Sequence, residues 1–298
     1  MKIKDIHNGL KEQLYCSNDN IDYAVLAACE FDKPVLIEGD PGVGKTSLAK
    51  AVAKMLGLEV VRLQMYEGLT DDKVLYDYDY QRQLLTLEAI KPKLEAELKG
   101  LNTNESIHRI ANDIDFYGRE FLIPRPILRT IDGSGRKLLL IDEIDKASEE
   151  TEYMLYEYLE DYSITIPQFG KIECPKNQRP IVFLTSNGYR ELSGALRRRC
   201  AYLYIEKKTR NEIVSILSMK ANVDDNVANG IAACMVALQE KALKHPISIS
   251  EAIDWAKFLK EGRSRERALG SLGLLVKDNR DMTVVKNVVS QKGGKIWA

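Results

Sequence analysis

The chain has 298 residues, of which 45% are hydrophobic and 29% charged, and its formal net charge is −1. This length is enough for one large domain and a smaller one, and the near-zero charge argues against nucleic acid as the partner. No run of 18 apolar residues is present, and the five cysteines are never spaced C-x-x-C. We therefore expect a cytoplasmic protein without a membrane span, zinc site or disulfide framework.

Five short apolar runs in the first two hundred residues predict the strands of a parallel sheet. They alternate with amphipathic stretches, which is the pattern of an α/β domain with helices on both faces of the sheet. The runs cover residues 34–38, 58–65, 137–142, 180–186 and 201–205. We expect this α/β domain to span residues 1–205, with a polar helical insertion at residues 91–112.

The pattern changes after residue 205. Thr209-x-x-Glu212 and Ser248-x-x-Glu251 are capping boxes, the sequence signature of a helix N-terminus. Apolar residues between them and beyond recur at helical spacing, and no strand pattern is evident. Residues 206–298 are therefore predicted to form a small all-α domain.

The strongest motif follows the first predicted strand. It reads Gly39-Asp40-Pro41-Gly42-Val43-Gly44-Lys45-Thr46, a full match to the P-loop pattern G-x-x-x-x-G-K-[ST]. Its glycines let backbone N–H groups point at phosphate oxygens, and the following helix N-terminus adds partial positive charge. We predict that Lys45 reaches the β- and γ-phosphates of ATP and that Thr46 binds Mg²⁺. The alternative is a glycine-rich turn that only caps a helix. The predicted nucleotide-binding residues are Asp40, Pro41, Gly42, Val43, Gly44, Lys45, Thr46 and Ser47.

A second site element is the apolar run at residues 137–142, which ends in Asp142-Glu143. A strand that ends in two acids is typical of a Walker B element. We assign Asp142 to Mg²⁺ and Glu143 to the water that attacks the γ-phosphate. Without a P-loop, acids at a helix start would be an ordinary structural feature.

Two polar features follow further along the chain. The apolar run at residues 180–186 leads into Asn187, whose amide is our candidate for positioning the attacking water; the alternative is a turn asparagine before Gly188. Arg197, Arg198 and Arg199 precede the last predicted strand. We expect Arg199, with Arg198 as second choice, to contact the γ-phosphate bound by a neighbouring subunit. A cluster that only stabilises a helix C-terminus is the alternative.

In this order the motifs resemble the AAA+ superfamily and, within it, the MoxR family. The resemblance covers residues 23–275 and is closest to the branch that contains the maturation ATPase of molybdenum carbon monoxide dehydrogenase. Besides the nucleotide motifs, it rests on RLQMYEGL (62–69), REFLIPRP (119–126), TIP (165–167), ALRRRC (195–200) and AIDW (252–255).

The resemblance implies a sheet of order 5-1-4-3-2, a helical lid and a homo-oligomeric, usually hexameric, ring. It also implies chaperone-like work on a client protein complex such as a metalloenzyme, with a partner that carries a von Willebrand factor A domain. Two insertions, at residues 67–85 and 162–177, would face the pore or the client. In the first, Tyr76, Tyr78 and Tyr80 alternate with acids, which is more typical of a half-buried strand than of client contacts.

One departure from related lids concerns the region around Ser248. Many AAA+ lids carry an arginine near the start of a lid helix, but residues 247–252 contain none. Either another basic residue such as Lys257 replaces it, or the lid responds less strongly to the nucleotide.

Three functions are compatible with these patterns. The first is an ATP-driven remodelling or maturation chaperone, which we expect. The second is a nucleic-acid motor of the AAA+ class, and the third is a nucleotide-switched scaffold with little turnover, against which Glu143 argues. No base-specific motif distinguishes ATP from GTP, and only AAA+ precedent favours ATP.

Overall fold

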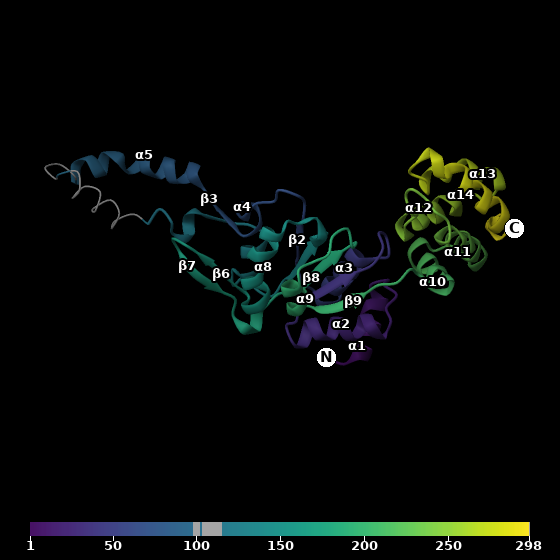
Figure 1. Ribbon diagram of the computed structural model, residues 1–298, viewed down its shortest axis with the longest axis horizontal. Coiled ribbons are helices and arrows are strands. Elements are labelled where there is room, and N and C mark those ends of the chain that lie inside the picture. The colour runs from purple at the N-terminus through teal and green to yellow at the C-terminus, as the bar shows by residue number, and fades with distance from the viewer. Residues whose placement is uncertain (98–101, 103–114, 298) are drawn as a thin grey trace.

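The computed structural model describes residues 1–97, 102 and 115–297. Its centre is a five-stranded sheet in which every neighbouring pair is parallel (Figure 1). Read across the sheet, the strands are β2 (Val60–Gln64), β5 (Leu138–Asp142), β8 (Ile181–Ser186), β1 (Val35–Glu38) and β9 (Ala201–Tyr204). Counted along the chain from the other edge, this is the predicted order 5-1-4-3-2.

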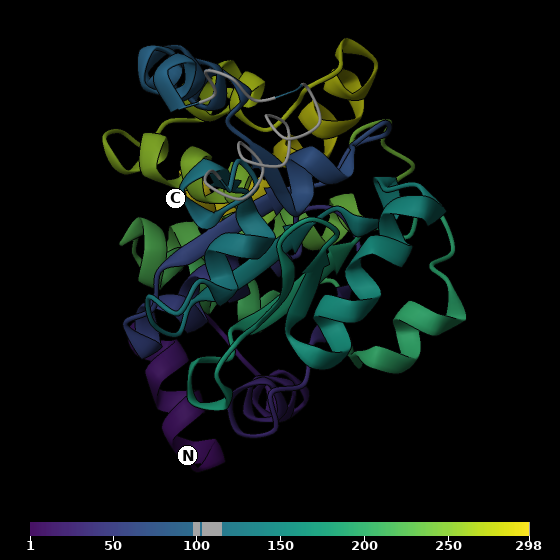
Figure 2. The same cartoon turned by 90° about the vertical axis from the view of Figure 1, so that its left-hand side faces the viewer.

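Helices cover both faces of this sheet, as expected for strands that are apolar on both sides. Strands β5 and β8 are buried along their whole length. One core cluster joins the sheet to the first three helices and the other joins it to three later helices. The first set is α1 (Ile3–Glu12), α2 (Asp19–Glu30) and α3 (Lys45–Leu56); the second is α7 (Pro126–Ile131), α8 (Glu149–Asp161) and α9 (Gly194–Arg199). Figure 2, seen from the end of the molecule that carries helix α5 (Tyr80–Glu97), shows α1 below the sheet.

Two antiparallel strand pairs lie outside the central sheet, and neither pairing was predicted. The first pairs β3 (Tyr76–Tyr78) with β4 (Leu122–Pro124), and the second pairs β6 (Ser163–Ile166) with β7 (Gly170–Glu173). Strands β3, β6 and β7 fall within the insertions expected at residues 67–85 and 162–177, whereas β4 lies well beyond the end of the first insertion. These strands are only three or four residues long, too short for a clear apolar alternation.

The tyrosine alternation is a strand only in part. Tyr76 and Tyr78 belong to β3, and Tyr78 is buried in the core. Tyr80 instead begins helix α5 (Tyr80–Glu97) and is 69% exposed. A single half-buried strand through all three tyrosines was therefore wrong, because the chain turns into a helix after Tyr78.

Helix α5 extends away from the sheet, beyond β3 and the short α4 (Asp71–Val74) (Figure 1). It contains Pro92 and covers the start of the helical insertion expected at residues 91–112. The rest of that expected insertion, apart from residue 102, lies outside the described residues. No helix among those that the structure describes is both long and apolar enough to cross a membrane.

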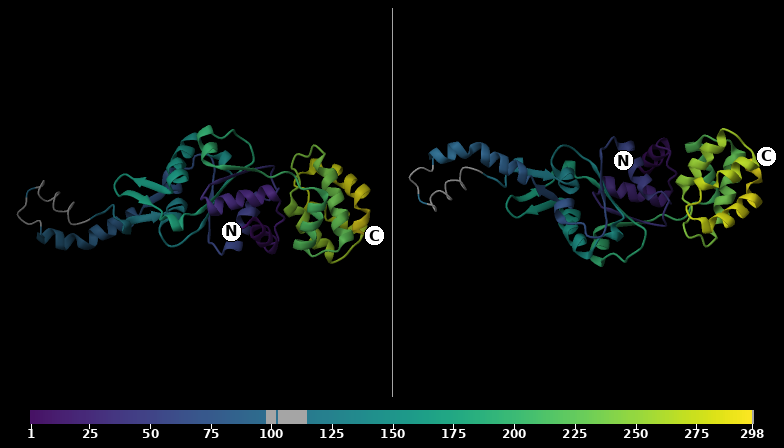
Figure 3. Two further views of the ribbon diagram at one scale, coloured as in Figure 1. Left: turned by 90° about the horizontal axis from the view of Figure 1, so that it is seen from below. Right: turned by 90° about the horizontal axis from the view of Figure 1, so that it is seen from above.

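The chain after β9 is helical and has its own apolar core around the fully buried Trp255. Both predicted capping boxes are present, at Thr209–Glu212 and Ser248–Glu251. Figures 1 and 3 place this helical region and α5 at opposite ends of the molecule. Its helices are α10 (Arg210–Ala221), α11 (Asp225–Gln239), α12 (Ile249–Lys260), α13 (Arg265–Gly270) and α14 (Asn279–Lys292).

Candidate nucleotide site

The predicted P-loop connects β1 to α3 at the carboxyl edge of the sheet. Gly42 and Gly44 have φ values of 81° and 103°, in the region that favours glycine. Gly44 is the N-cap of α3 and has no side chain to satisfy the first amides of the helix. Those N–H groups therefore remain available to an anion, together with the positive end of a 12-residue helix dipole.

Lys45 is the first residue of α3, at the end of the loop, and is 7% exposed. Its Nζ donates to Gly39 O at 2.6 Å, to Asp40 O at 3.0 Å and to Asn187 Oδ1 at 2.7 Å. Burial lowers the pKa of Lys45, and nearby carboxylates, Asp145 first among them, oppose this shift. The ammonium group is thus held by neutral oxygens that a phosphate could replace.

Thr46 and Asp142 meet across the loop, although 96 residues separate them in sequence. Thr46 Oγ1 donates to Asp142 Oδ1 at 3.2 Å, and Thr185 Oγ1 donates to the same oxygen at 2.5 Å. Asp142 itself is 5% exposed. A hydroxyl and a carboxylate at this distance are oxygen ligands of the kind that Mg²⁺ prefers, so the residues fit the predicted metal.

Glu143 follows directly after β5 in a left-handed conformation, with φ of 59°. Its backbone N–H donates to Thr185 Oγ1 at 3.0 Å. Its carboxylate accepts a hydrogen bond from Gln64 Nε2 at 2.8 Å and forms an ion pair with Lys146, also at 2.8 Å. The hydrogen bond with Glu143 raises the pKa of Lys146. Both groups restrain the acid that we assigned to water activation.

Asn187 lies where β8 ends, beside Lys45. The bond from Lys45 Nζ to its side-chain oxygen places the amide next to the phosphate-binding lysine. Its backbone N–H donates to Asp145 Oδ2 at 2.9 Å, and the N–H of Tyr189 donates to the same oxygen at 3.0 Å. The turn after β8 is therefore fixed by a buried carboxylate from the loop that follows β5.

The three arginines of α9 have different surroundings. Arg197 forms an ion pair with Glu38 at 2.8 Å, just before its own P-loop. Arg199 pairs with Glu160 at 2.6 Å and lies over the ring of Tyr156, at 4.6 Å from its centroid. Arg198 is exposed, and in the described part of the chain it has no hydrogen bond or ion pair.

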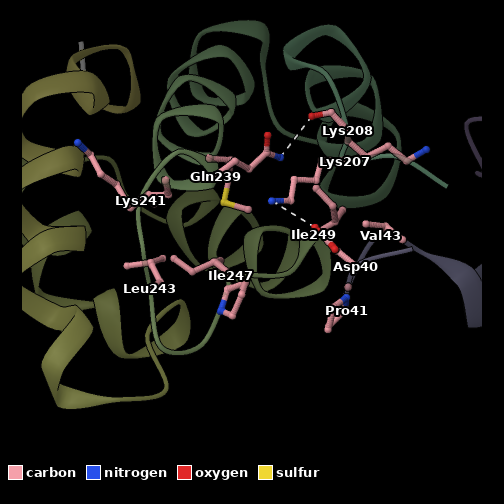
Figure 4. A pocket seen from close by; sticks show the side chains of 14 residues that line it. Asp40, Pro41, Val43, Lys207, Lys208, Gln239, Lys241, Leu243, Ile247 and Ile249 are labelled. Atoms are coloured by element: carbon pink, nitrogen blue, oxygen red, sulfur yellow. Dashed lines mark hydrogen bonds and ion pairs between the residues drawn. The ribbon is translucent and has the colours of Figure 1, made fainter. Parts of the chain in front are cut away.

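The helical region contacts the P-loop directly. A cavity of about 90 Å³ is lined by Asp40, Pro41 and Val43 of the P-loop and by Ile247 and Ile249 of the helical region. Figure 4 shows the side chains around it. Lys207 closes it through an ion pair with Asp40 at 3.2 Å, and Gln239 donates to the backbone oxygen of Lys208.

A second cavity, of about 40 Å³, lies against the other side of the loop. Tyr15, Ser47, Ile216 and Ile253 contribute to its lining, together with Gly44. Its apolar side chains and backbone edges could enclose a planar ring. The sequence analysis did not identify Tyr15, which precedes α2, as part of this cavity.

The segment without a lid arginine contacts the P-loop through backbone packing. A Cβ atom on Gly42 would overlap the Cβ of Ser248 and lie 2.9 Å from its Cα. Ser248 is the N-cap of α12, so this helix starts directly on the phosphate loop. Lys257, the suggested replacement for the arginine, is exposed near the C-terminal end of α12 and lines neither cavity.

Comparison with known proteins agrees with this geometry. The model of the AAA domain (dynein-related subfamily) matches residues 34–200, more than half of the chain. This chain belongs to the AAA family of ATPases. The match begins just before the P-loop and ends after the three arginines.

Curated relatives of this AAA protein are distant. Midasin of Giardia intestinalis is 31% identical over 112 residues, which is 35% of this chain and 2% of midasin. Replication factor C subunit 3 of Arabidopsis thaliana is 25% identical over 73% of this chain and 56% of that protein. Lon protease 1 of Myxococcus xanthus is 27% identical over 85% of this chain and 26% of Lon. The chain thus spans little more than half of these relatives at most.

Among solved structures, the RuvB Holliday junction branch migration motor of Thermotoga maritima is similar. It shares 20% sequence identity with this AAA protein, at a TM-score of 0.43. The superposition covers 95% of this chain and 68% of RuvB.

Three residues around the AAA site were not predicted. Asp145 supports the Asn187 turn, Gln64 contacts Glu143, and Arg62 contacts Asp142 with Nη2 at 2.6 Å. Asp145 lies only three residues after Asp142 in sequence, and this closeness could have indicated that it also belongs to the site. Arg62 and Gln64 alternate along β2 and were noted only as part of the family resemblance.

Proposed function

We propose that this chain is a magnesium-dependent ATPase of a ring-shaped, chaperone-like complex that remodels or matures a client protein. The observation that carries the ATPase part is the meeting of Lys45, Thr46 and Asn187 with Asp142 and Glu143 at one edge of the sheet. Phosphate-binding, metal-binding and water-activating groups thus converge on one point. AAA membership favours adenine over guanine as the base.

Each residue has a distinct task in this mechanism. Lys45 and the amides of the P-loop hold the β- and γ-phosphates, and Thr46 with Asp142 holds Mg²⁺. The bound metal supplies positive charge that offsets the phosphate oxygens. Glu143 accepts the proton of the attacking water, whose oxygen forms a bond to the γ-phosphorus as the bond to the β-phosphate oxygen breaks. Asn187 orients that water, and ADP and phosphate leave.

We propose residues 1–205 as the nucleotide-binding domain and residues 206–298 as a lid that follows the nucleotide state. The contact between Ser248 and Gly42 supports this division of labour, because α12 starts on the loop that a triphosphate would occupy. A change in the conformation of the P-loop would therefore shift the start of α12 and, with it, the helical region.

The client and partners follow from the resemblance to the MoxR family. We propose a cytoplasmic hexameric ring with a von Willebrand factor A domain partner and a client such as a metalloenzyme complex. The β6–β7 hairpin supports a client-facing role, since Phe169 at its turn is 36% exposed. The name of the replication factor C relative suggests work on nucleic acid, so a nucleic-acid motor is the second candidate. A net charge of −1 argues against it.

The Glu143→Gln variant tests the ATPase assignment. It should bind ATP within about threefold of the wild type while turnover falls at least about a hundredfold, the usual contribution of a general base. Glu149→Gln is the matched control, because Glu149 is an exposed acid six residues away on α8. Undiminished hydrolysis in Glu143→Gln would contradict the assigned role and favour another base.

The same variant identifies the class of client. An ATP-trapped Glu143→Gln ring should retain protein partners that the wild type releases. Capture of nucleic acid alone, or stimulation of hydrolysis by DNA that disappears at high salt, would favour the motor instead. A wild type that binds ATP without hydrolysing it would favour a scaffold.

A further inference from the structure

Strand β2 contacts both acids of the metal and water site. It runs parallel to β5 at the edge of the sheet, with Gln64 opposite Asp142 and Arg62 opposite Leu140. Because side chains alternate along a strand, Arg62 and Gln64 leave β2 on the same face. They lie side by side and each contacts one acid.

Arg62 contacts the acid that we assign to the metal. Its Nε and Nη2 donate to Asp142 Oδ2 at 3.1 and 2.6 Å, while the other carboxylate oxygen accepts from two threonine hydroxyls. A carboxylate that is only 5% exposed needs such a partner, since burying an unpaired charge is costly. The guanidinium therefore supplies the positive charge at this place.

The same guanidinium also reaches the water-activating acid through one intermediate. Arg62 Nη2 donates to Gln64 Oε1 at 2.5 Å, and Gln64 Nε2 donates to Glu143 Oε2 at 2.8 Å. One side chain is thus connected to Asp142 directly and to Glu143 through Gln64. The side chain of Arg62 is 52% exposed, so it has room to turn toward solvent.

We propose that Arg62 is a positioning residue whose guanidinium neutralises Asp142 where Mg²⁺ would otherwise do so. In this way it links the binding of Mg²⁺ to the release of Glu143 from Gln64. The proposal rests on the proposed function. Two cations near one carboxylate repel each other, so Arg62 turns outward when Mg²⁺ binds. Its bond to Gln64 then breaks, and Gln64 holds Glu143 less firmly.

Mg²⁺ titration of the ADP complex by calorimetry tests this idea without relying on turnover. Arg62→Ala removes the competing charge, so Mg²⁺ should bind about tenfold more tightly than in the wild type. Arg129→Ala is the matched control, because Arg129 is 50% exposed and pairs with Glu59 at 2.9 Å. It should leave Mg²⁺ affinity unchanged. Unchanged or weaker Mg²⁺ binding in Arg62→Ala would overturn the proposal.

Arg62→Lys separates charge from geometry and guards against misfolding of the alanine variant. It keeps the positive charge, so its Mg²⁺ affinity should stay within about twofold of the wild type. A tenfold gain in the lysine variant would contradict charge competition. ADP binding without Mg²⁺ is measured first. If the wild type binds no nucleotide, the proposed function fails. If it binds nucleotide but Arg62→Ala has unaltered Mg²⁺ affinity, only this inference is refuted.

Discussion

At the residue scale, the buried carboxylate of Asp145 has a role that its neighbours in sequence do not reveal. It is 3% exposed, and its Oδ2 accepts the backbone N–H groups of Asn187 and Tyr189. Its other oxygen has no hydrogen-bond partner among the described residues. Asp145 thus fixes the turn that presents the Asn187 amide to Lys45.

We expect Asp145→Ala to slow hydrolysis about tenfold by loosening this turn, and to lower the free energy of unfolding by about 2–4 kcal/mol. If Asp145 acts through Asn187, the Asp145→Ala change should have less than about a twofold further effect on kcat in an Asn187→Ala background. Steady-state kinetics of the two single variants and the double variant measure this coupling.

A purely structural role of Asp145 would give independent, multiplying losses in that cycle. Asp145→Asn provides the conservative comparison, because its amide oxygen can still accept both N–H groups. Asp145→Asn should therefore keep most of the wild-type turnover. It should also keep most of the free energy of unfolding that Asp145→Ala loses.

Residue types and local spacing revealed some site residues from sequence, but not all of them. Lys45 and Thr46 stand in a contiguous motif whose function depends on its own backbone. Arg62 and Gln64 lie about 80 residues from the acids that they contact. Only the pairing of β2 with β5 brings them together, and one sequence does not specify which side chains meet across it.

At the element scale, the five central strands were predicted to within about two residues because each lies in a mainly apolar stretch. The strand pairs β3–β4 and β6–β7 were missed, since β7 is mostly exposed and β4 follows β3 only after a long intervening segment. The helical region was recognisable from its capping boxes. Its contact with the P-loop was not, because Ser248 and Gly42 are joined only by tertiary packing.

This packing predicts the effect of Gly42→Ala. A methyl group at Gly42 would overlap Ser248, so α12 must move away from the loop. We expect weaker ATP binding, by about tenfold or more, and faster proteolysis of the connection between β9 and α10. Nucleotide binding and limited proteolysis provide the measurements.

Gly57→Ala is the matched control for the backbone. Gly57 has φ of 66°, but a Cβ there would meet nothing within 4 Å. Both substitutions therefore carry backbone strain of about 1 kcal/mol, and only Gly42→Ala also displaces the helix. Equal effects of the two variants on nucleotide binding would show that the contact with Ser248 is unimportant.

At the scale of the whole molecule, the three arginines indicate which surface another copy would complete. Arg197 and Arg199 are paired within the chain, whereas Arg198 is exposed and unpaired among the described residues. An arginine that acts on a neighbouring nucleotide must be free to reach it. This favours Arg198 over Arg199, the first choice from sequence, within the proposed ring.

Arg198→Ala should therefore bind ATP normally and lose most of its turnover, about a hundredfold or more. Arg199→Ala should mainly loosen α9, since Arg199 joins this helix to Glu160 and Tyr156. Thermal melting and steady-state hydrolysis separate the two effects. Full activity of Arg198→Ala would return the assignment to Arg199.

Mixing two inactive variants decides whether the arginine acts between subunits. In a mixed ring, each Arg198→Ala subunit still has an intact Glu143, and each Glu143→Gln subunit still has an intact Arg198. A complete site therefore forms wherever the first kind of subunit binds the nucleotide and the second kind, as its neighbour, provides the arginine. Random assembly of equal amounts should restore about a quarter of the wild-type rate. If Arg198 served its own nucleotide, no combination of these subunits would hold both groups at one site, and the mixture would stay inactive.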